Sequence, residues 1–273
     1  MTVVERPARP AVERSPWKAV AVPSEHGGWG LTAEPILLGL LVAFTWSGVA
    51  VGVAALLAFL LRTPLKLTLV DLRRGRWLAR SRLATAVAGA EFAVIAGLAA
   101  LVIRADGWGW LAPALIAAPL VAVELWFDIR SRGRRLVPEL CGAAGIAASA
   151  ASIAVIGGES ARLGAALWLV LAGRAVGSIP FVRSQIIRLR RGVTTTTSSD
   201  AAQAVMVAAG AVAVALDRRA FLGAIALVLL AVFQLNRARH DPPPPKVLGV
   251  RQMLVGFGLV AITAAGVLAA QPG

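Results

Sequence analysis

The strongest constraint on this chain is a succession of nine apolar stretches, separated by short segments that carry charge, glycine or proline. They cover roughly residues 33–46, 48–67, 83–103, 108–128, 137–156, 161–182, 201–216, 219–235 and 248–270. About 20 apolar residues cross the hydrocarbon core of a bilayer, and most of the stretches reach this length. Because lipid cannot hydrogen-bond the backbone, such spans should be helices. The sequence therefore predicts an all-α, polytopic membrane bundle of about nine transmembrane helices.

The composition agrees with this class of protein. Hydrophobic residues make up 58% of the 273 residues and charged residues only 15%, which is too little polar surface to cover a soluble globule. The first two stretches are barely separated, and the first and seventh are short. A bundle of eight spans is therefore the alternative.

The distribution of basic residues predicts the orientation of the bundle. With the amino terminus inside, the inner segments of a nine-span chain hold 23 of the 28 Lys and Arg residues, and the outer segments hold four. The remaining one, Arg174, falls inside the sixth span. Because cytosolic loops are enriched in Lys and Arg, we expect a cytosolic amino terminus and an external carboxyl terminus. The net charge of +14 is explained by these loops and does not indicate nucleic-acid binding.

The domain organisation follows from the same pattern. Residues 1–22 are rich in Arg and Pro and lack an apolar run of signal-peptide length, so we expect a disordered, basic cytosolic tail. Residues 23–273 should form a single transmembrane domain. The single Cys141 excludes an intrachain disulfide. Motifs for nucleotide hydrolysis, structural zinc, zincins and serine hydrolases are absent from the sequence.

Two of the inner segments resemble each other. At an offset of 117 residues, Leu189–Gly192 repeats the sequence of Leu72–Gly75, while Lys66 aligns with Arg183 and Asp71 with Arg188. Internal repeats are common in polytopic membrane proteins. We therefore expect a two-repeat arrangement in which the ends of the second and sixth spans face each other. The alternative is chance similarity between two arginine-rich segments.

Several basic residues in and beside these two spans are candidates for binding a substrate. They are Arg62, Lys66, Arg174, Arg183 and Arg188. A charge in the bilayer core costs about 3 kcal/mol or more, so each needs a partner or a function. If the two segments face each other, these side chains form a cationic, cytosol-facing pocket suited to a lipidic phosphate or diphosphate. The alternative is that they snorkel toward anionic lipid.

The acidic candidates lie elsewhere in the bundle. Glu124 and Asp128 are four residues apart at the inner end of the fourth span, so both project from one helix face. They could bind a metal ion, and the alternative is salt bridges to Arg130 or Arg62. Glu91 lies in the middle of the third span, either as a buried protonated carboxyl or as a partner of Arg174.

The segment Pro23–Gly30 is a further candidate, because it places acidic, imidazole and glycine residues where the tail meets the membrane. Glu25 and His26 could act there as metal ligands or as acid-base groups over the mouth of a cavity. The alternative is an interfacial turn anchored by Trp29.

The segments Pro23–Gly30 and Arg62–Lys66 resemble the YwiC-like family of bacterial membrane proteins, and the resemblance extends over most of the chain. This implies a multi-pass protein of the bacterial cytoplasmic membrane and no particular activity. A more distant resemblance is to the UbiA superfamily of intramembrane prenyltransferases. Those proteins have nine helices, an inside amino terminus and two aspartate-rich motifs at the cytosolic ends of helices two and six.

In the UbiA superfamily the aspartates bind a prenyl diphosphate through magnesium. Here the first motif keeps only Asp71, which is a candidate catalytic residue. The second motif has Arg188 instead of an aspartate. The resemblance implies an isoprenoid or other lipidic phosphate as ligand, with Mg²⁺ if that ligand is a diphosphate. The leading hypothesis is a UbiA-like bundle that binds such a ligand, with or without transfer of its hydrocarbon. The alternatives are a transporter whose path is lined by Glu91, Arg174 and Glu139, and a non-catalytic membrane scaffold.

Overall fold

The computed structural model describes residue 20 and residues 26–192 and 195–270. In these ranges the regular structure is entirely helical. The helices are α2 (His26–Val42), α3 (Trp46–Arg73), α4 (Ala79–Asp106), α5 (Leu111–Ile129), α6 (Leu136–Ile156), α7 (Ala161–Arg191), α8 (Thr197–Leu216), η1 (Arg218–Ala220), α9 (Phe221–Arg237) and α10 (Pro245–Ala269). The prediction of an all-α bundle is confirmed.

Among the described residues, eight helical segments are long and apolar enough to cross a membrane, with η1 and α9 counted as one. The remaining helix, α2, has 17 residues and is therefore about 26 Å long, slightly shorter than the hydrocarbon core of about 30 Å. It covers His26–Val42 rather than the expected 33–46. The segment Pro23–Gly30 is thus not wholly an interfacial turn, because residues from His26 onward already belong to α2.

Two helices extend well beyond the apolar stretches that predicted them. The 28 residues of α3 and the 31 residues of α7 both exceed the thickness of the hydrocarbon core. The last turn of α7 holds Arg188, Arg190 and Arg191, whose charges interact favourably with the carbonyl end of the helix. The helix then ends at Gly192, which has a left-handed φ of 68° that favours glycine. The arginine-rich segment that follows the sixth apolar stretch is therefore a helical extension up to Arg191 rather than a loop.

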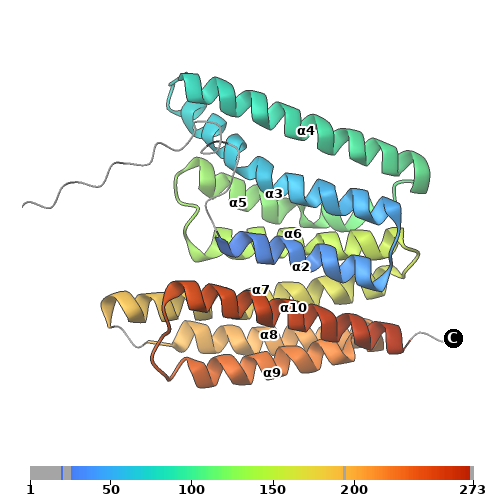
Figure 1. Cartoon of the computed structure of the whole chain (residues 1–273), viewed down its shortest axis with the longest axis vertical. Helices are drawn as coiled ribbons and strands as arrows, with labels where there is room; N and C mark the ends of the chain where they lie inside the picture. Colours follow the sequence, from blue (N-terminus) through green and yellow to red (C-terminus); the bar gives the residue numbers. More distant parts are fainter. Residues whose placement is uncertain (1–19, 21–25, 193–194, 271–273) are drawn as a thin grey trace, which may run out of the picture.

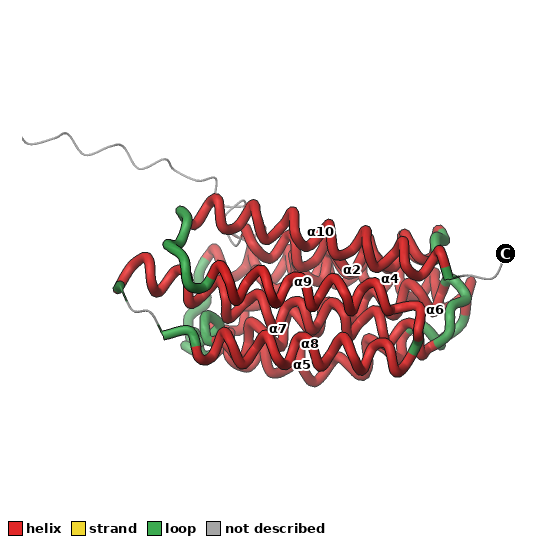
Figure 2. Tube along the Cα trace, turned by 90° about the horizontal axis from the view of Figure 1, so that it is seen from below, coloured by secondary structure: helices red, strands yellow, loops and turns green. Residues whose placement is uncertain are grey.

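The helices run side by side along the molecule, with the connecting loops at its two ends (Figures 1 and 2). Figure 1 shows α3–α6 in the upper part, α7–α10 in the lower part and α2 between them. Helix α2 packs against α3, α6, α7 and α10. The short helix that opens the described bundle is thus central to it.

The two groups of four helices repeat the same contacts. Helix α3 packs against α4, α5 and α6, and helix α7 packs against α8, α9 and α10. The repeated segments Leu72–Gly75 and Leu189–Gly192 lie at the carboxyl ends of α3 and α7. However, α2 and α6 each pack against both of these helices. Helices α3 and α7 are therefore linked through α2 and α6.

Small side chains allow the central helices to approach closely. A Cβ atom added at Gly39 of α2 would lie 2.7 Å from Ile153 of α6 and 3.2 Å from the carbonyl of Ala150. Such small-residue contacts drive helix association in lipid, where the hydrophobic effect does not hold helices together. By contrast, α4 packs mainly on α3 and exposes Phe92 and Leu101, as expected of a lipid-facing helix.

Candidate functional site

A cavity of about 410 Å³ lies between α2, α3, α5, α6 and α7. Most of its wall is apolar, formed by residues such as Leu31, Phe59, Leu125, Ile146 and Ile179. It is lined by the first turns of α2 and α6 and the last turns of α5, so it lies toward the arginine-rich end of the bundle. An apolar cavity with a few polar groups at one end is the usual form of a small-molecule site.

Asp128 organises the polar end of this cavity. Its side chain is fully buried, with Oδ2 accepting a hydrogen bond of 2.8 Å from Arg62 Nε and Oδ1 accepting one of 3.0 Å from Lys66 Nζ. Arg62 Nη1 also lies 2.9 Å from Glu124 Oε1. The i, i+4 spacing within α3 and within α5 places two cations opposite two carboxylates. The salt-bridge interpretation of Glu124 and Asp128 therefore describes the structure, with Arg62 as the partner.

A second ion pair borders the same cavity. Arg183 Nη1 of α7 donates to Glu139 Oε2 of α6 at 2.8 Å and to the carbonyl of Arg134 at 3.0 Å. Glu139 itself lines the cavity. The three cations and three carboxylates of this cluster have a formal net charge of zero. The polar end is therefore a set of balanced ion pairs instead of the purely cationic wall that the sequence suggested.

Two glycines make room for the carboxylates. A Cβ atom added at Gly142 would collide with the carboxylate of Glu124, and one added at Gly133 would collide with that of Asp128. Gly142 also lines the cavity. The close approach of backbone and carboxylate fixes the position of each acid, and neither glycine was identified from the sequence.

The donor set does not fit a resident metal ion. Both oxygens of Asp128 and one of Glu124 already contact Arg62 or Lys66. Within the described part of the chain, no three His, Cys, Asp or Glu side chains are grouped so as to hold a metal. A metal at Glu124 and Asp128 would therefore have to displace these cations.

Other candidate residues lie away from the cavity. Asp71 accepts hydrogen bonds from Ser81 Oγ at 2.7 Å and Arg80 Nη2 at 3.1 Å, and so ties the end of α3 to the start of α4. Arg188 donates to the carbonyls of Ala238 and His240. Glu25 and the side chain of His26 lie outside the described residues.

Arg174 binds Glu34 of α2 at 2.8 Å, and both side chains are almost completely buried. The partner is thus Glu34 and not Glu91, which lies half-buried on the peripheral α4. Sequence analysis could recognise Glu34 as an acid near the membrane, but no spacing rule connects positions this far apart. Glu91, Arg174 and Glu139, the proposed transport path, lie on three different helices, and Arg174 pairs with Glu34 while Glu139 pairs with Arg183.

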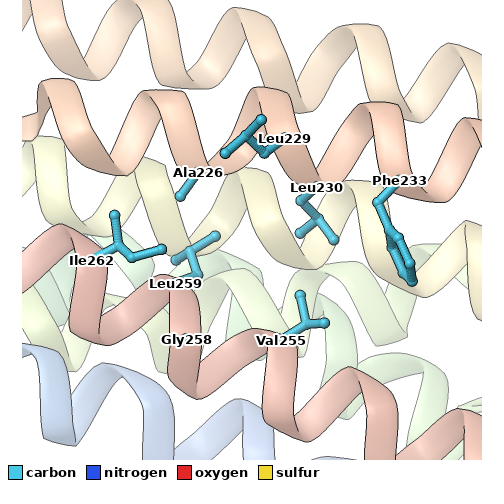
Figure 3. Close-up of a pocket in the computed structure, with 8 residues that line it drawn as sticks. All are labelled: Ala226, Leu229, Leu230, Phe233, Val255, Gly258, Leu259 and Ile262. Carbon is cyan, nitrogen blue, oxygen red and sulfur yellow. The ribbon is translucent and has the colours of Figure 1, made fainter.

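A smaller crevice of about 230 Å³ lies between α9 and α10 (Figure 3). It is lined by Ala226, Leu229, Leu230, Phe233, Val255, Gly258, Leu259 and Ile262. None of these side chains can form a hydrogen bond. The crevice therefore lacks the polar groups that would orient a ligand, and the ion-paired cavity is the better candidate site.

The fold and its long apolar helices define an α-helical, multi-pass integral membrane protein. More particularly, a family model described as YwiC-like protein matches residues 22–154, which confirms the resemblance over this part of the chain. The match extends into α6 and includes Arg62, Lys66, Glu124, Asp128 and Glu139. No curated protein and no solved structure matches the chain.

Proposed function

We propose that the cavity binds an amphiphile whose hydrocarbon lies against the apolar wall and whose phosphate or diphosphate is held at the polar end. The observation that carries this proposal is the anchoring of Arg62 and Lys66 on the buried Asp128, at one end of an otherwise apolar cavity. Asp128 holds both cations in place, so they do not lose conformational freedom when a headgroup binds.

Lys66 is a candidate for contact with the headgroup: it does not itself line the cavity, but it binds Asp128, which does. Its side chain is 38% exposed, and one of its three N–H groups is used by Asp128. Arg183, 36% exposed, has donors beyond the Nη1 that contacts Glu139. Charge-assisted hydrogen bonds from these two residues and Arg62 would bind phosphate oxygens. Because the cluster has no net charge, the apolar wall must contribute a large part of the binding free energy.

The proposal concerns binding and not prenyl transfer. Asp71, the remaining trace of an aspartate-rich motif, is hydrogen-bonded at the α3–α4 turn and does not line the cavity. An isoprenoid phosphate is one ligand of this class, because its hydrocarbon chain is apolar along its whole length.

The test is thermal stabilisation of the purified protein by geranylgeranyl diphosphate. The corresponding alcohol and inorganic diphosphate serve as controls, since each has only one half of the proposed ligand. We expect a shift in Tm with the diphosphate ester only. The shift should be lost in Arg62→Ala combined with Arg183→Ala, strongly reduced in Lys66→Gln and retained in Arg190→Gln, which alters an exposed arginine of α7.

Two glycine-to-alanine substitutions give an independent control. Gly142→Ala should reduce the shift because the new Cβ displaces Glu124, whereas Gly89→Ala should leave it unchanged because nothing lies within 4 Å of that position. The absence of any shift with geranylgeranyl diphosphate and other polyprenyl phosphates would refute the proposal. An equal shift with geranylgeraniol would show that the ion-paired residues do not recognise phosphate.

A further inference from the structure

Among the described residues, one pair of buried charged side chains lies apart from the cavity lining. Arg174 Nη2 lies 2.8 Å from Glu34 Oε1 and donates to the carbonyl of Gln252 at 2.8 Å. The side chains of Arg174 and Glu34 are only 3% and 2% exposed. This contact joins α2 to α7 and α10 in the middle of the bundle.

The surroundings of this pair are built to admit it. A Cβ atom added at Gly256 of α10 would collide with both the carboxylate of Glu34 and the guanidinium of Arg174. A buried ion pair usually stabilises a protein no better than well-packed apolar side chains, because desolvation of the charges offsets their attraction. Its retention at membrane depth is better explained by a specific geometry that it enforces.

The relevant geometry is the position of the part of the cavity wall that α2 forms. Helix α2 contributes Gly27, Gly28, Leu31 and Thr32 to the cavity, and Glu34 follows within one helical turn. Pro35 comes next, and since it has no N–H it cannot bond the carbonyl of Leu31. The helix is therefore weakened where it meets the cavity.

Interior prolines also occur in neighbouring helices that line the cavity. The helices with an interior proline are α2, α3, α5 and α7, through Pro35, Pro64, Pro119 and Pro180, and all four line the cavity. The sequences of α4, α8 and α9 contain no proline. Proline permits bending of a helix, so contacts between side chains must fix where the cavity wall lies.

We propose that Glu34 and Arg174 are a positioning pair that holds the α2 wall of the cavity against α7 and α10. Removal of the pair lets α2 move and widens the cavity on that side. This inference goes beyond the proposed ligand, because it concerns the shape of the cavity whatever molecule occupies it.

The test measures accessibility without any ligand. In a Cys141→Ala background, a reporter cysteine is placed on the α2 wall by Leu31→Cys and, separately, on the α5 wall by Leu125→Cys. The rate of modification by N-ethylmaleimide is measured in membranes. With Glu34→Gln or Arg174→Met, the rate at position 31 should rise about fivefold or more, the factor that corresponds to roughly 1 kcal/mol. The rate at position 125 should change less than about twofold.

Further variants separate positioning from simple loss of charge balance. Gly256→Ala keeps both charges but displaces them, so it should raise the rate at position 31, whereas Gly258→Ala, with nothing within 4 Å, should not. Arg174→Lys keeps the positive charge, so the modification rate at position 31 should stay close to that of the parent. The double variant of Glu34→Gln with Arg174→Met has no uncompensated charge, but it also lacks the contact that holds α2. The modification rate at position 31 should therefore stay high.

Three results would overturn the inference. The first is an unchanged rate at position 31 in Glu34→Gln, Arg174→Met and Gly256→Ala. The second is a parallel rise at positions 31 and 125, which would indicate general loosening of the bundle. The third is a return to the parental rate in the double variant, which would show that only the uncompensated charge mattered. Failure of geranylgeranyl diphosphate to bind has no bearing on these measurements.

Discussion

Asp128→Asn should be strongly destabilising because it replaces the single acceptor group that two cations share. The amide keeps one oxygen for Arg62 or Lys66 and presents its NH₂ group to the other. Breaking a fully buried ion pair costs about 3–5 kcal/mol. Here the cost is lower, because the side chains of Arg62 and Lys66 are 25% and 38% exposed and water can solvate part of each charge.

We therefore expect a loss of about 2–3 kcal/mol in the free energy of unfolding. At roughly 2–4 °C per kcal/mol for a chain of this size, Tm should fall by about 5–10 °C. The measurement is thermal unfolding in detergent at neutral pH without ligand. Glu139→Gln is the matched comparison, because its partner Arg183 is 36% exposed and Glu139 is itself 34% exposed, so its loss should cost under about 1 kcal/mol.

A double-mutant cycle with Lys66→Met completes the test. Removing Lys66 together with the carboxylate of Asp128 removes one stranded charge, so the two effects should be less than additive by about 1 kcal/mol or more. The reasoning is refuted if Asp128→Asn lowers Tm no more than Glu139→Gln does. It is also refuted if the effects of the two substitutions simply add.

Two further predictions concern the α3–α4 turn and the orientation of the bundle. Asp71→Asn should lower Tm, because the buried carboxylate loses charge-assisted contacts with Ser81 and Arg80. The shift produced by geranylgeranyl diphosphate should survive, and its loss would mean that Asp71 acts at the ligand site. For orientation, a cysteine added by Arg191→Cys in a Cys141→Ala background should resist an impermeant thiol reagent in intact cells, while one added by Arg218→Cys should react. The reverse labelling would refute the orientation inferred from the charge bias.

Much of the architecture could be predicted because lipid imposes simple rules on sequence. Runs of apolar residues had to become helices, and their number and approximate positions followed from length and hydropathy. Boundaries were less predictable. Helix α7 continues to Arg191 because its arginines suit the end of a helix that projects beyond the hydrocarbon. Helix α2 starts earlier than its apolar stretch because its first turn is packed beside α3, where Trp29 meets Phe59 edge-on.

The charged residues themselves were visible in the sequence because ionised side chains are so unusual in apolar stretches. Arg62, Lys66, Glu124, Asp128 and Arg174 were all identifiable in this way, as were the two i, i+4 spacings. Their partners were determined only by the packing of helices distant in the chain. Arg62 belongs with Asp128 because α3 lies against α5, and Arg174 belongs with Glu34 because α2 lies against α7. The tertiary structure thus replaced the predicted cationic pocket by a cavity with balanced charges, since pairing depends on distance in space and sequence fixes only distance along the chain.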